Sequence, residues 1–197
     1  MRATVLGCIV TLCSVGAAQA SAVADCNQVR DPQLRLRACS QIITGSGYAI
    51  NEKALAYRNR ANARSDVGAN TEALADFNEA VNLRPDDSTS YAGRARVRLA
   101  LRDFDGATAD FSEALRLDPG TVSSNIGRGH AHFVRGDTTA AIADFTEAIR
   151  LNPQSASAYN RRGLAYRRSG HLSHAPLPLP STPSTPSPTA DQESKDR

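Results

Sequence analysis

The sequence predicts an all-α protein, an α-solenoid in which pairs of antiparallel helices stack along one axis. Two observations predict this fold. Three segments align without a gap at a spacing of 34 residues: ALADFNEAVNLRPDD from Ala73, ATADFSEALRLDPGT from Ala107 and AIADFTEAIRLNPQS from Ala141. A second helical segment of about fourteen residues precedes each of them, so that every unit contains two helices. Because a single unit cannot bury its apolar face alone, neighbouring units are expected to stack.

The first element, residues 1–20, has the features of a secretory signal peptide. Arg2 precedes an uncharged apolar run, and the run ends in the small-residue pattern Ala18-Gln19-Ala20. The run is shorter than the roughly 20 residues of a membrane-spanning helix, so cleavage near Ser21 and no later membrane insertion are expected. Acylation at Cys8 is an alternative, although few residues precede it. The sequence therefore predicts a periplasmic or secreted protein.

Residues 21–49 are expected to cap the array. A helix is predicted from about Pro32 to Ile43, and the segment contains the two cysteines that remain after signal cleavage, Cys26 and Cys39. In an oxidising compartment these thiols are expected to form a disulfide. A redox or metal-binding pair is the alternative, but CxxC spacing and neighbouring ligands are both missing from the sequence. A disulfide here would hold the cap on the first repeat.

Residues 50–170 form the repeat array. The first helices are expected in KALAYRNRANARSDVG, STSYAGRARVRLALRD and VSSNIGRGHAHFVRGD, with a fourth in SASAYNRRGLAYRRSG. Gly68, Gly136 and Gly170 follow these helices, where a left-handed conformation favours Gly, and Arg102 holds this place in the second repeat. The second helices share Ala, Phe, Ala, Leu and Pro at fixed places: Ala73, Ala107 and Ala141; Phe77, Phe111 and Phe145; Ala80, Ala114 and Ala148; Leu83, Leu117 and Leu151; Pro85, Pro119 and Pro153.

This arrangement resembles the tetratricopeptide-repeat (TPR) family, whose 34-residue pattern contains an early aromatic residue, a small residue four places on and a second aromatic place. The resemblance implies repeats at about 54–87, 88–121 and 122–155 and a half repeat at 156–170. The early aromatic residues are Tyr57, Tyr91 and Tyr159, with Asn125 departing, and the small residues are Ala61, Ala95, Gly129 and Gly163. Arg64, Arg98 and His132 depart from the second aromatic place, and Tyr166 matches it.

A charged pattern has the same period as the repeat. An Arg stands at the same place in all four units, and an Asp follows sixteen residues after each of the first three. An acidic or catalytic pair is one interpretation, but repetition in every unit favours a salt bridge between the two helices of a repeat. The residues are Arg60, Arg94, Arg128 and Arg162 with Asp76, Asp110 and Asp144.

The last element, residues 171–197, departs from the repeat. Six of the ten prolines lie between Pro176 and Pro188, which excludes a helix and favours a disordered, extended tail. The tail is either a native Pro-rich linker or partner ligand, or out-of-frame sequence that replaced an ordinary second helix. Translation of the other two reading frames after codon 175 distinguishes these alternatives, because only a frameshift would leave an AIADF-like helix there.

The family resemblance also implies a peptide-binding groove along the first helices. Members that bind a terminal carboxylate use Lys, Asn and Arg at particular places, and here Arg96, Ile126 and His130 depart from that scheme. The remaining surface suits a partly acidic, partly apolar peptide or helix. A surface that is only solvated or used in packing is the alternative. The candidate groove residues are Arg58, Asn62, Arg96, Leu99, Ile126, His130, Phe133, Asn160 and Arg167.

No pattern typical of an enzyme is present, because the sequence lacks a Gly-rich phosphate loop, a nucleophile elbow, HExxH and CxxC. No cofactor or metal is therefore expected. After signal cleavage 22 basic residues stand against 20 acidic ones, a balance that does not indicate nucleic-acid binding. The sequence predicts a non-catalytic interaction scaffold or adaptor of the bacterial cell envelope. A structural spacer without a defined ligand and a truncated or frameshifted product are alternatives, and the partner and oligomeric state stay open.

Overall fold

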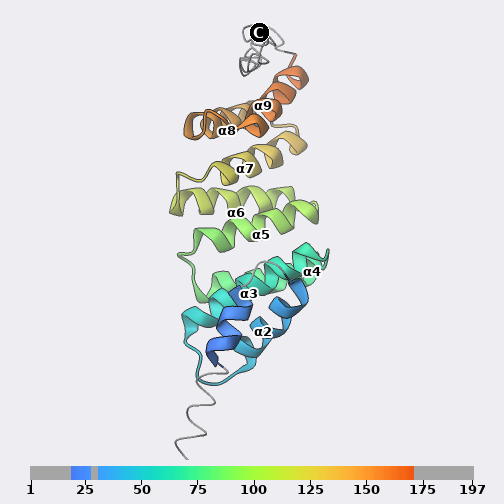
Figure 1. Cartoon of the computed structure of the whole chain (residues 1–197). Helices are drawn as coiled ribbons and strands as arrows, with labels where there is room; N and C mark the ends of the chain where they lie inside the picture. The colour runs from blue at the N-terminus through green and yellow to red at the C-terminus, as the bar shows by residue number, and fades with distance from the viewer. Residues whose placement is uncertain (1–18, 28–30, 171–197) are drawn as a thin grey trace, which may run out of the picture.

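The computed structural model describes residues 19–27 and 31–170. A short helix occupies residues 19–27, and no strand is present in the described ranges. Figure 1 shows the helices stacked in chain order along one axis, which confirms the predicted all-α solenoid. The remaining helices are α2 (Pro32–Thr44), α3 (Ile50–Asp66), α4 (Asn70–Leu83), α5 (Ser88–Ala100), α6 (Phe104–Leu117), α7 (Val122–Arg135), α8 (Thr138–Leu151) and α9 (Ala156–Arg168). Most of the predicted signal peptide and the whole predicted tail, residues 171–197, lie outside the described residues.

The core of the array is built from the second-helix residues that recur in every repeat. The three Phe side chains at 77, 111 and 145 are at most 2% exposed, and the recurring Ala residues beside them are buried. Each of the first two rings packs against the next first helix where that helix has a Gly. A Cβ on Gly93 would overlap the Phe77 ring, and one on Gly127 would overlap the Phe111 ring. The aromatic ring therefore needs the small residue, and the pair joins one repeat to the next.

Glycine substitutions test this packing because the structure contains a matched control. Gly127→Ala is expected to destabilise the fold by about 1–3 kcal/mol, since the new methyl group meets the Phe111 ring. Gly163→Ala, in α9, is expected to stabilise by up to about 1 kcal/mol, because a Cβ there meets no atom within 4 Å and Ala favours a helix. Urea unfolding of both variants measures the two free energies. Equal effects of the two substitutions would contradict the packing described here.

The breaks between helices follow the sequence pattern. Gly136 ends α7 with a φ of 98° and donates its N–H to the carbonyl oxygens of His132 and Phe133. Arg102 takes the equivalent place after α5 with a φ of 64°, the single non-glycine residue of the described chain with a positive φ. The departure of Arg102 from the glycine pattern therefore changes the residue and leaves the backbone turn in place.

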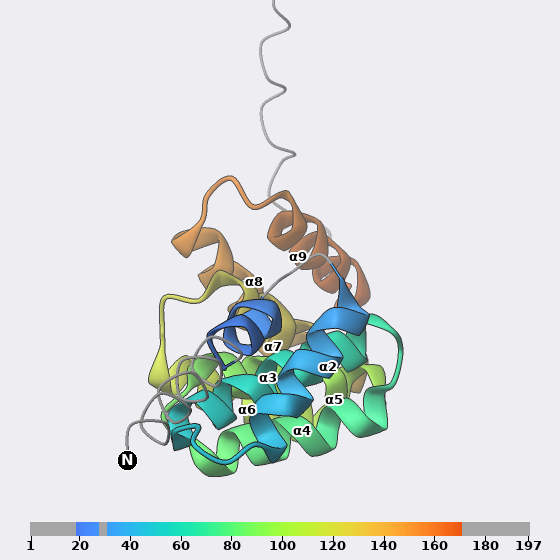
Figure 2. The ribbon, with the colours of Figure 1, turned by 60° about the horizontal axis from the view of Figure 1, so that its bottom comes forward.

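The N-terminal end contains one helix more than the sequence analysis predicted. The predicted helix is present as α2, where Asp31 caps the start by accepting hydrogen bonds from the N–H groups of Gln33 and Leu34. The additional helix at 19–27 lies against it, and Figure 2 brings this end of the stack forward. This helix spans the expected signal cleavage site. The segment was missed because its apolar residues adjoin the signal-like run and the helix is short.

The predicted disulfide is present between these two helices. Cys26 and Cys39 are bonded, with their Cα atoms 4.8 Å apart. Both cysteines are buried in a small cluster with Ala22, Ala38 and Ile42, and this cluster continues onto α3 through Ala56. The pair formed by helix 19–27 and α2 therefore covers the apolar end of the first repeat, as a solenoid cap must.

Candidate peptide-binding groove

The recurring Arg and Asp residues form the predicted salt bridges between the two helices of each complete repeat. Arg94 shows the geometry: its Nε and Nη2 donate to the two carboxylate oxygens of Asp110 at 2.8 and 2.7 Å. Arg60 binds Asp76 with the same two distances, and Arg128 binds Asp144 in the same manner. The three carboxylates are buried, so they are structural groups and do not face a ligand.

The residues that replace the second aromatic residue of the repeat pattern, Arg64, Arg98 and His132, approach the same carboxylates. Arg64 Nη1 lies 2.7 Å from Asp76, and Arg98 Nη1 lies 2.8 Å from Asp110. In the third repeat, His132 Nε2 is 3.9 Å from Asp144. Two guanidinium groups therefore share one buried carboxylate in each of the first two repeats. This explains why a cation replaces the aromatic residue there.

Arg58, a candidate groove residue, is already paired with a carboxylate. Its Nη1 lies 2.9 Å from Asp87, which begins α5 and also accepts hydrogen bonds from the Ser90 hydroxyl and the Thr89 N–H. Burial raises the pKa of Asp87, but Ser90, Arg58 and Thr89 outweigh that effect and hold the pKa below its usual range. Asp87 is therefore ionised at neutral pH, and it neutralises the positive charge of Arg58.

Arg96 is placed differently on the same surface. Its side chain is exposed, and its Nη2 donates to the Asn62 amide oxygen at 3.2 Å. Among the residues that the structure describes, no carboxylate lies within 4.0 Å of this guanidinium. Arg96 therefore carries a positive charge that is available to a ligand, and the hydrogen bond to Asn62 orients one edge of its guanidinium group.

The apolar candidates are only half-exposed. Ile126 and Phe133 pack against the buried cluster of Ala141, Phe145 and Ala165, so part of each side chain belongs to the core. Arg168 covers Phe133 further, with its guanidinium 5.0 Å from the ring centroid. Leu99 is half-buried near the end of α5. One alternative in the sequence analysis was that this surface is used in internal packing. That alternative is partly correct for Ile126 and Phe133.

The candidates toward the C-terminal end carry different electrostatics. His130 is half-buried, and burial together with the neighbouring Arg161 charge lowers its pKa. The imidazole of His130 is therefore neutral at neutral pH and adds no positive charge to the groove. Asn160 and Arg167 lie exposed on α9. The free cations of the candidate set are thus Arg96 in the second repeat and Arg167 in the fourth.

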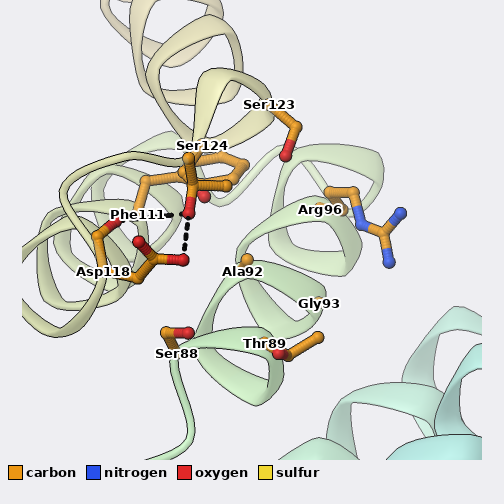
Figure 3. A pocket seen from close by; sticks show the side chains of 10 residues that line it. Ser88, Thr89, Ala92, Gly93, Arg96, Phe111, Asp118, Ser123 and Ser124 are labelled. Atoms are coloured by element: carbon orange, nitrogen blue, oxygen red, sulfur yellow. Dashed lines mark hydrogen bonds between the residues drawn. The ribbon is translucent and has the colours of Figure 1, made fainter. Parts of the chain in front are cut away.

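A pocket of about 260 Å³ opens between α5 and α7 beside Arg96. Figure 3 shows Ser88 and Asp118 at one side of the pocket and Arg96 at the other. The Asp118 carboxylate accepts a hydrogen bond from the Thr121 hydroxyl at 2.8 Å. The Ser124 hydroxyl is buried and has no hydrogen-bond partner in the described structure. The lining residues are Ser88, Thr89, Ala92, Gly93, Arg96, Phe111, Asp118, Thr121, Ser123 and Ser124.

Most of this pocket was missed by the candidate set, which contained Arg96 alone of its lining residues. A signal was available, because this place of the first helix is Ala56 in the first unit and Ala158 in the fourth, but Ser90 and Ser124 in the two units between them. A hydroxyl at a place that is otherwise Ala indicates a local polar environment. The pocket can accept a small polar or anionic group, with hydroxyl donors on its walls and a guanidinium at its edge.

A membrane-spanning helix and a metal-binding cluster are both absent from the described residues. None of their helices is both long and apolar enough to cross a membrane. No three side chains of His, Cys, Asp or Glu in that part of the chain are grouped as a metal ion would require.

Comparison with protein families finds two repeat models along the array. A model described as tetratricopeptide repeat matches residues 58–121, and one described as TPR repeat matches residues 129–170. Together these matches span more than half of the chain. Among curated protein sequences, none matches this chain significantly.

Solved structures with the same fold include several repeat proteins. A crystal structure of MamA superposes with a TM-score of 0.72 at 18% identity, covering 81% of this chain and 87% of that chain. The TPR domain of Arabidopsis OM64 gives 0.59 at 26% identity, covering 60% and 98%. The first TPR domain of Spaghetti (RPAP3), bound to the HSP90 peptide SRMEEVD, gives 0.60 at 22% identity, covering 61% and 95%. These similarities establish the solenoid architecture.

Proposed function

Because the chain belongs to the tetratricopeptide-repeat family, we propose that it is a non-catalytic scaffold that holds a peptide segment of a partner protein along its first helices. The pocket beside Arg96 is the observation that carries this proposal. The solved RPAP3 domain that shares the fold has an HSP90 peptide bound, which supports a peptide as the kind of ligand. Fold alone does not assign a partner, so the chemistry of the groove must define it.

The groove chemistry favours a peptide with an acidic side chain next to an apolar one. Arg96 and the hydroxyls around the pocket supply donors for a carboxylate, and half-buried Leu99 lies three residues after Arg96 on the same helix. Arg58 cannot serve as the anion-binding residue at low cost, because a ligand would have to displace Asp87 from it. The acid-binding subsite is therefore assigned to the second repeat, between α5 and α7.

Selection from a phage-displayed library of random peptides tests this function on the mature chain. Peptides enriched in Asp or Glu are expected, and Arg96→Glu is expected to weaken their binding at least about tenfold, since it replaces a charge-assisted contact by repulsion. Arg116→Glu is the matched control, because it makes the same charge change on the exposed surface of α6, outside the candidate groove and the pocket. Isothermal titration calorimetry measures both affinities.

Two outcomes would contradict the groove proposal. One is a selection that yields no binding peptides, which would leave the structural-spacer alternative in place. The other is a set of peptides whose affinity is the same for wild type and Arg96→Glu.

We further propose that the protein acts in the bacterial periplasm or after secretion. The signal-like residues 1–20 and the buried Cys26–Cys39 disulfide support this location, because disulfides persist in oxidising compartments. Fusion of residues 1–25 to a reporter that folds only after export, such as alkaline phosphatase, tests it in a bacterial host. Activity is expected for the native segment and not for a control with Val10 and Leu12 changed to Arg. Equal reporter activity in both fusions would contradict export by this segment.

A further inference from the structure

Among the described residues, no helix covers the side of α9 that corresponds to the covered side of the other first helices. In each complete repeat the second helix of the same unit packs on this side, so Ala61 and Ala95 are fully buried. A Cβ on Gly129 would lie 2.8 Å from Phe145 Cε1, whereas one on Gly163, at the equivalent place of α9, would meet nothing within 4 Å. The described chain contains no helix after α9, which lies at the end of the stack in Figure 1.

The Arg of this uncovered side makes only part of its usual contacts. Arg94 and Arg128 each donate through Nη1 to the preceding second helix and through Nε and Nη2 to the Asp of their own unit. Arg162 retains the first contact, from Nη1 to the Thr146 hydroxyl at 3.2 Å. Its Nε is buried and has no hydrogen-bond partner among the described residues. The guanidinium is therefore held in the orientation that would receive an Asp.

We propose that this side of α9, made by Tyr159, Arg162, Gly163 and Tyr166 and here named the terminal face, binds a helix of another protein that carries an Asp. The three second helices show which helix fits, because each contains an Ala-x-Ala-Asp-Phe segment. In such a helix the Asp binds Arg162 through Nε and Nη2, and small residues pack at Gly163. The partner helix thus completes the fourth unit from outside the chain.

The sequence after α9 does not repeat the Ala-x-Ala-Asp-Phe segment. Sixteen residues after Arg162, where each complete repeat has its Asp, the sequence has Pro178, and the next carboxylate is Asp191. A second copy is also a poor occupant. Two terminal faces in contact would bring together the Arg162 guanidinium groups of the two copies, and like charges repel. The Asp residues of the second helices are buried and already bound to Arg. Charge complementarity therefore favours an Asp-bearing helix of a different protein.

A helical peptide with the sequence of residues 137–154 of this chain is the probe for the terminal face. The fluorescein-labelled peptide is titrated into the full-length mature chain, and fluorescence anisotropy measures its affinity. Saturable binding is expected. Asp144→Asn in the peptide is expected to weaken binding about tenfold, since the charged bond to Arg162 is lost. Arg162→Gln in the chain is expected to give the same loss, and the two changes together no further loss.

Matched variants distinguish this site from the groove and from general charge effects. Gly163→Leu is expected to abolish binding, because its side chain would occupy the place where the partner helix packs and where a Cβ meets no other atom within 4 Å. Arg116→Gln, an exposed Arg on α6, is expected to leave peptide affinity unchanged, whereas a loss in Arg96→Glu as large as that in Arg162→Gln would overturn the proposal by placing the peptide in the groove. The proposal is overturned by absence of saturable binding or by equal affinity of the Asp144→Asn peptide. A chain dimer in sedimentation velocity that Arg162→Gln dissociates would also overturn it, by assigning the face to a second copy.

Discussion

Asp110→Ala is expected to destabilise the protein by about 3–5 kcal/mol, because it removes the one carboxylate shared by two guanidinium groups. Asp110 is 3% exposed, and the side chains of Arg94 and Arg98 are 15% and 23% exposed. Without Asp110, Arg94 keeps no carboxylate partner among the described residues of this largely dry interface, and Arg98 keeps only the half-exposed Asp103, whose Oδ2 lies 3.5 Å from its Nε. Urea unfolding followed by circular dichroism at 222 nm, with the far-ultraviolet spectrum of the folded state as a reference, measures the loss.

Two comparison variants show whether the buried charge is the cause. Glu113→Ala removes a carboxylate from the same helix, but Glu113 pairs with Arg116 on the exposed surface, so little change is expected. Replacing Arg94 and Arg98 by Met in the Asp110→Ala background removes the unpaired cations, and much of the lost stability should return. A loss for Glu113→Ala as large as that for Asp110→Ala would contradict this explanation.

Replacing Cys26 and Cys39 together by Ala is expected to destabilise the protein by about 3 kcal/mol, because the disulfide closes a loop of about fourteen residues and restricts the unfolded chain. The effect should be concentrated at the N-terminal end. Hydrogen exchange of α2 is expected to rise strongly, whereas exchange of α6 and α7 should change little, since stacked repeats contact only their neighbours.

A reducing agent provides the control for this second prediction. Reduction of the wild-type protein should lower its stability toward that of the Ala variant, and the same treatment should not change the variant. If wild type and variant unfold at the same urea concentration under oxidising conditions, the disulfide does not stabilise the cap.

Much of the fold could be predicted from the sequence, because the residues that build the core recur at a fixed spacing. Phe77, Phe111 and Phe145 recur at one spacing, and so do Asp76, Asp110 and Asp144, so each packing contact and salt bridge appears three times in the sequence pattern. Repetition separates these contacts from chance. The additional helix at 19–27 occurs once and has no repeated pattern. The burial of Ala22 and Cys26 against α2 became evident only in the structure.

The candidate groove was predictable only in outline. Family resemblance placed Arg58 and Arg96 on one surface, but it did not show which of the two cations is already paired within the chain. The structure distinguishes them, since Asp87 neutralises Arg58 across a repeat junction and no carboxylate in the described part of the chain approaches Arg96. A contact that occurs in one repeat leaves no periodic trace, so sequence reasoning could not predict it.

The sequence by itself determined the repeat length, the order of the helices, the buried Arg–Asp pairs and the partners in the disulfide, because each depends on local helix formation or on a regularity within the chain. Only the tertiary structure decided which cation is free, where a pocket opens between α5 and α7, and that the Arg162 Nε is buried without a hydrogen-bond partner among the described residues. The physical reason is that these features depend on side chains from different repeats, whose separation and burial are set by the stacking of helices.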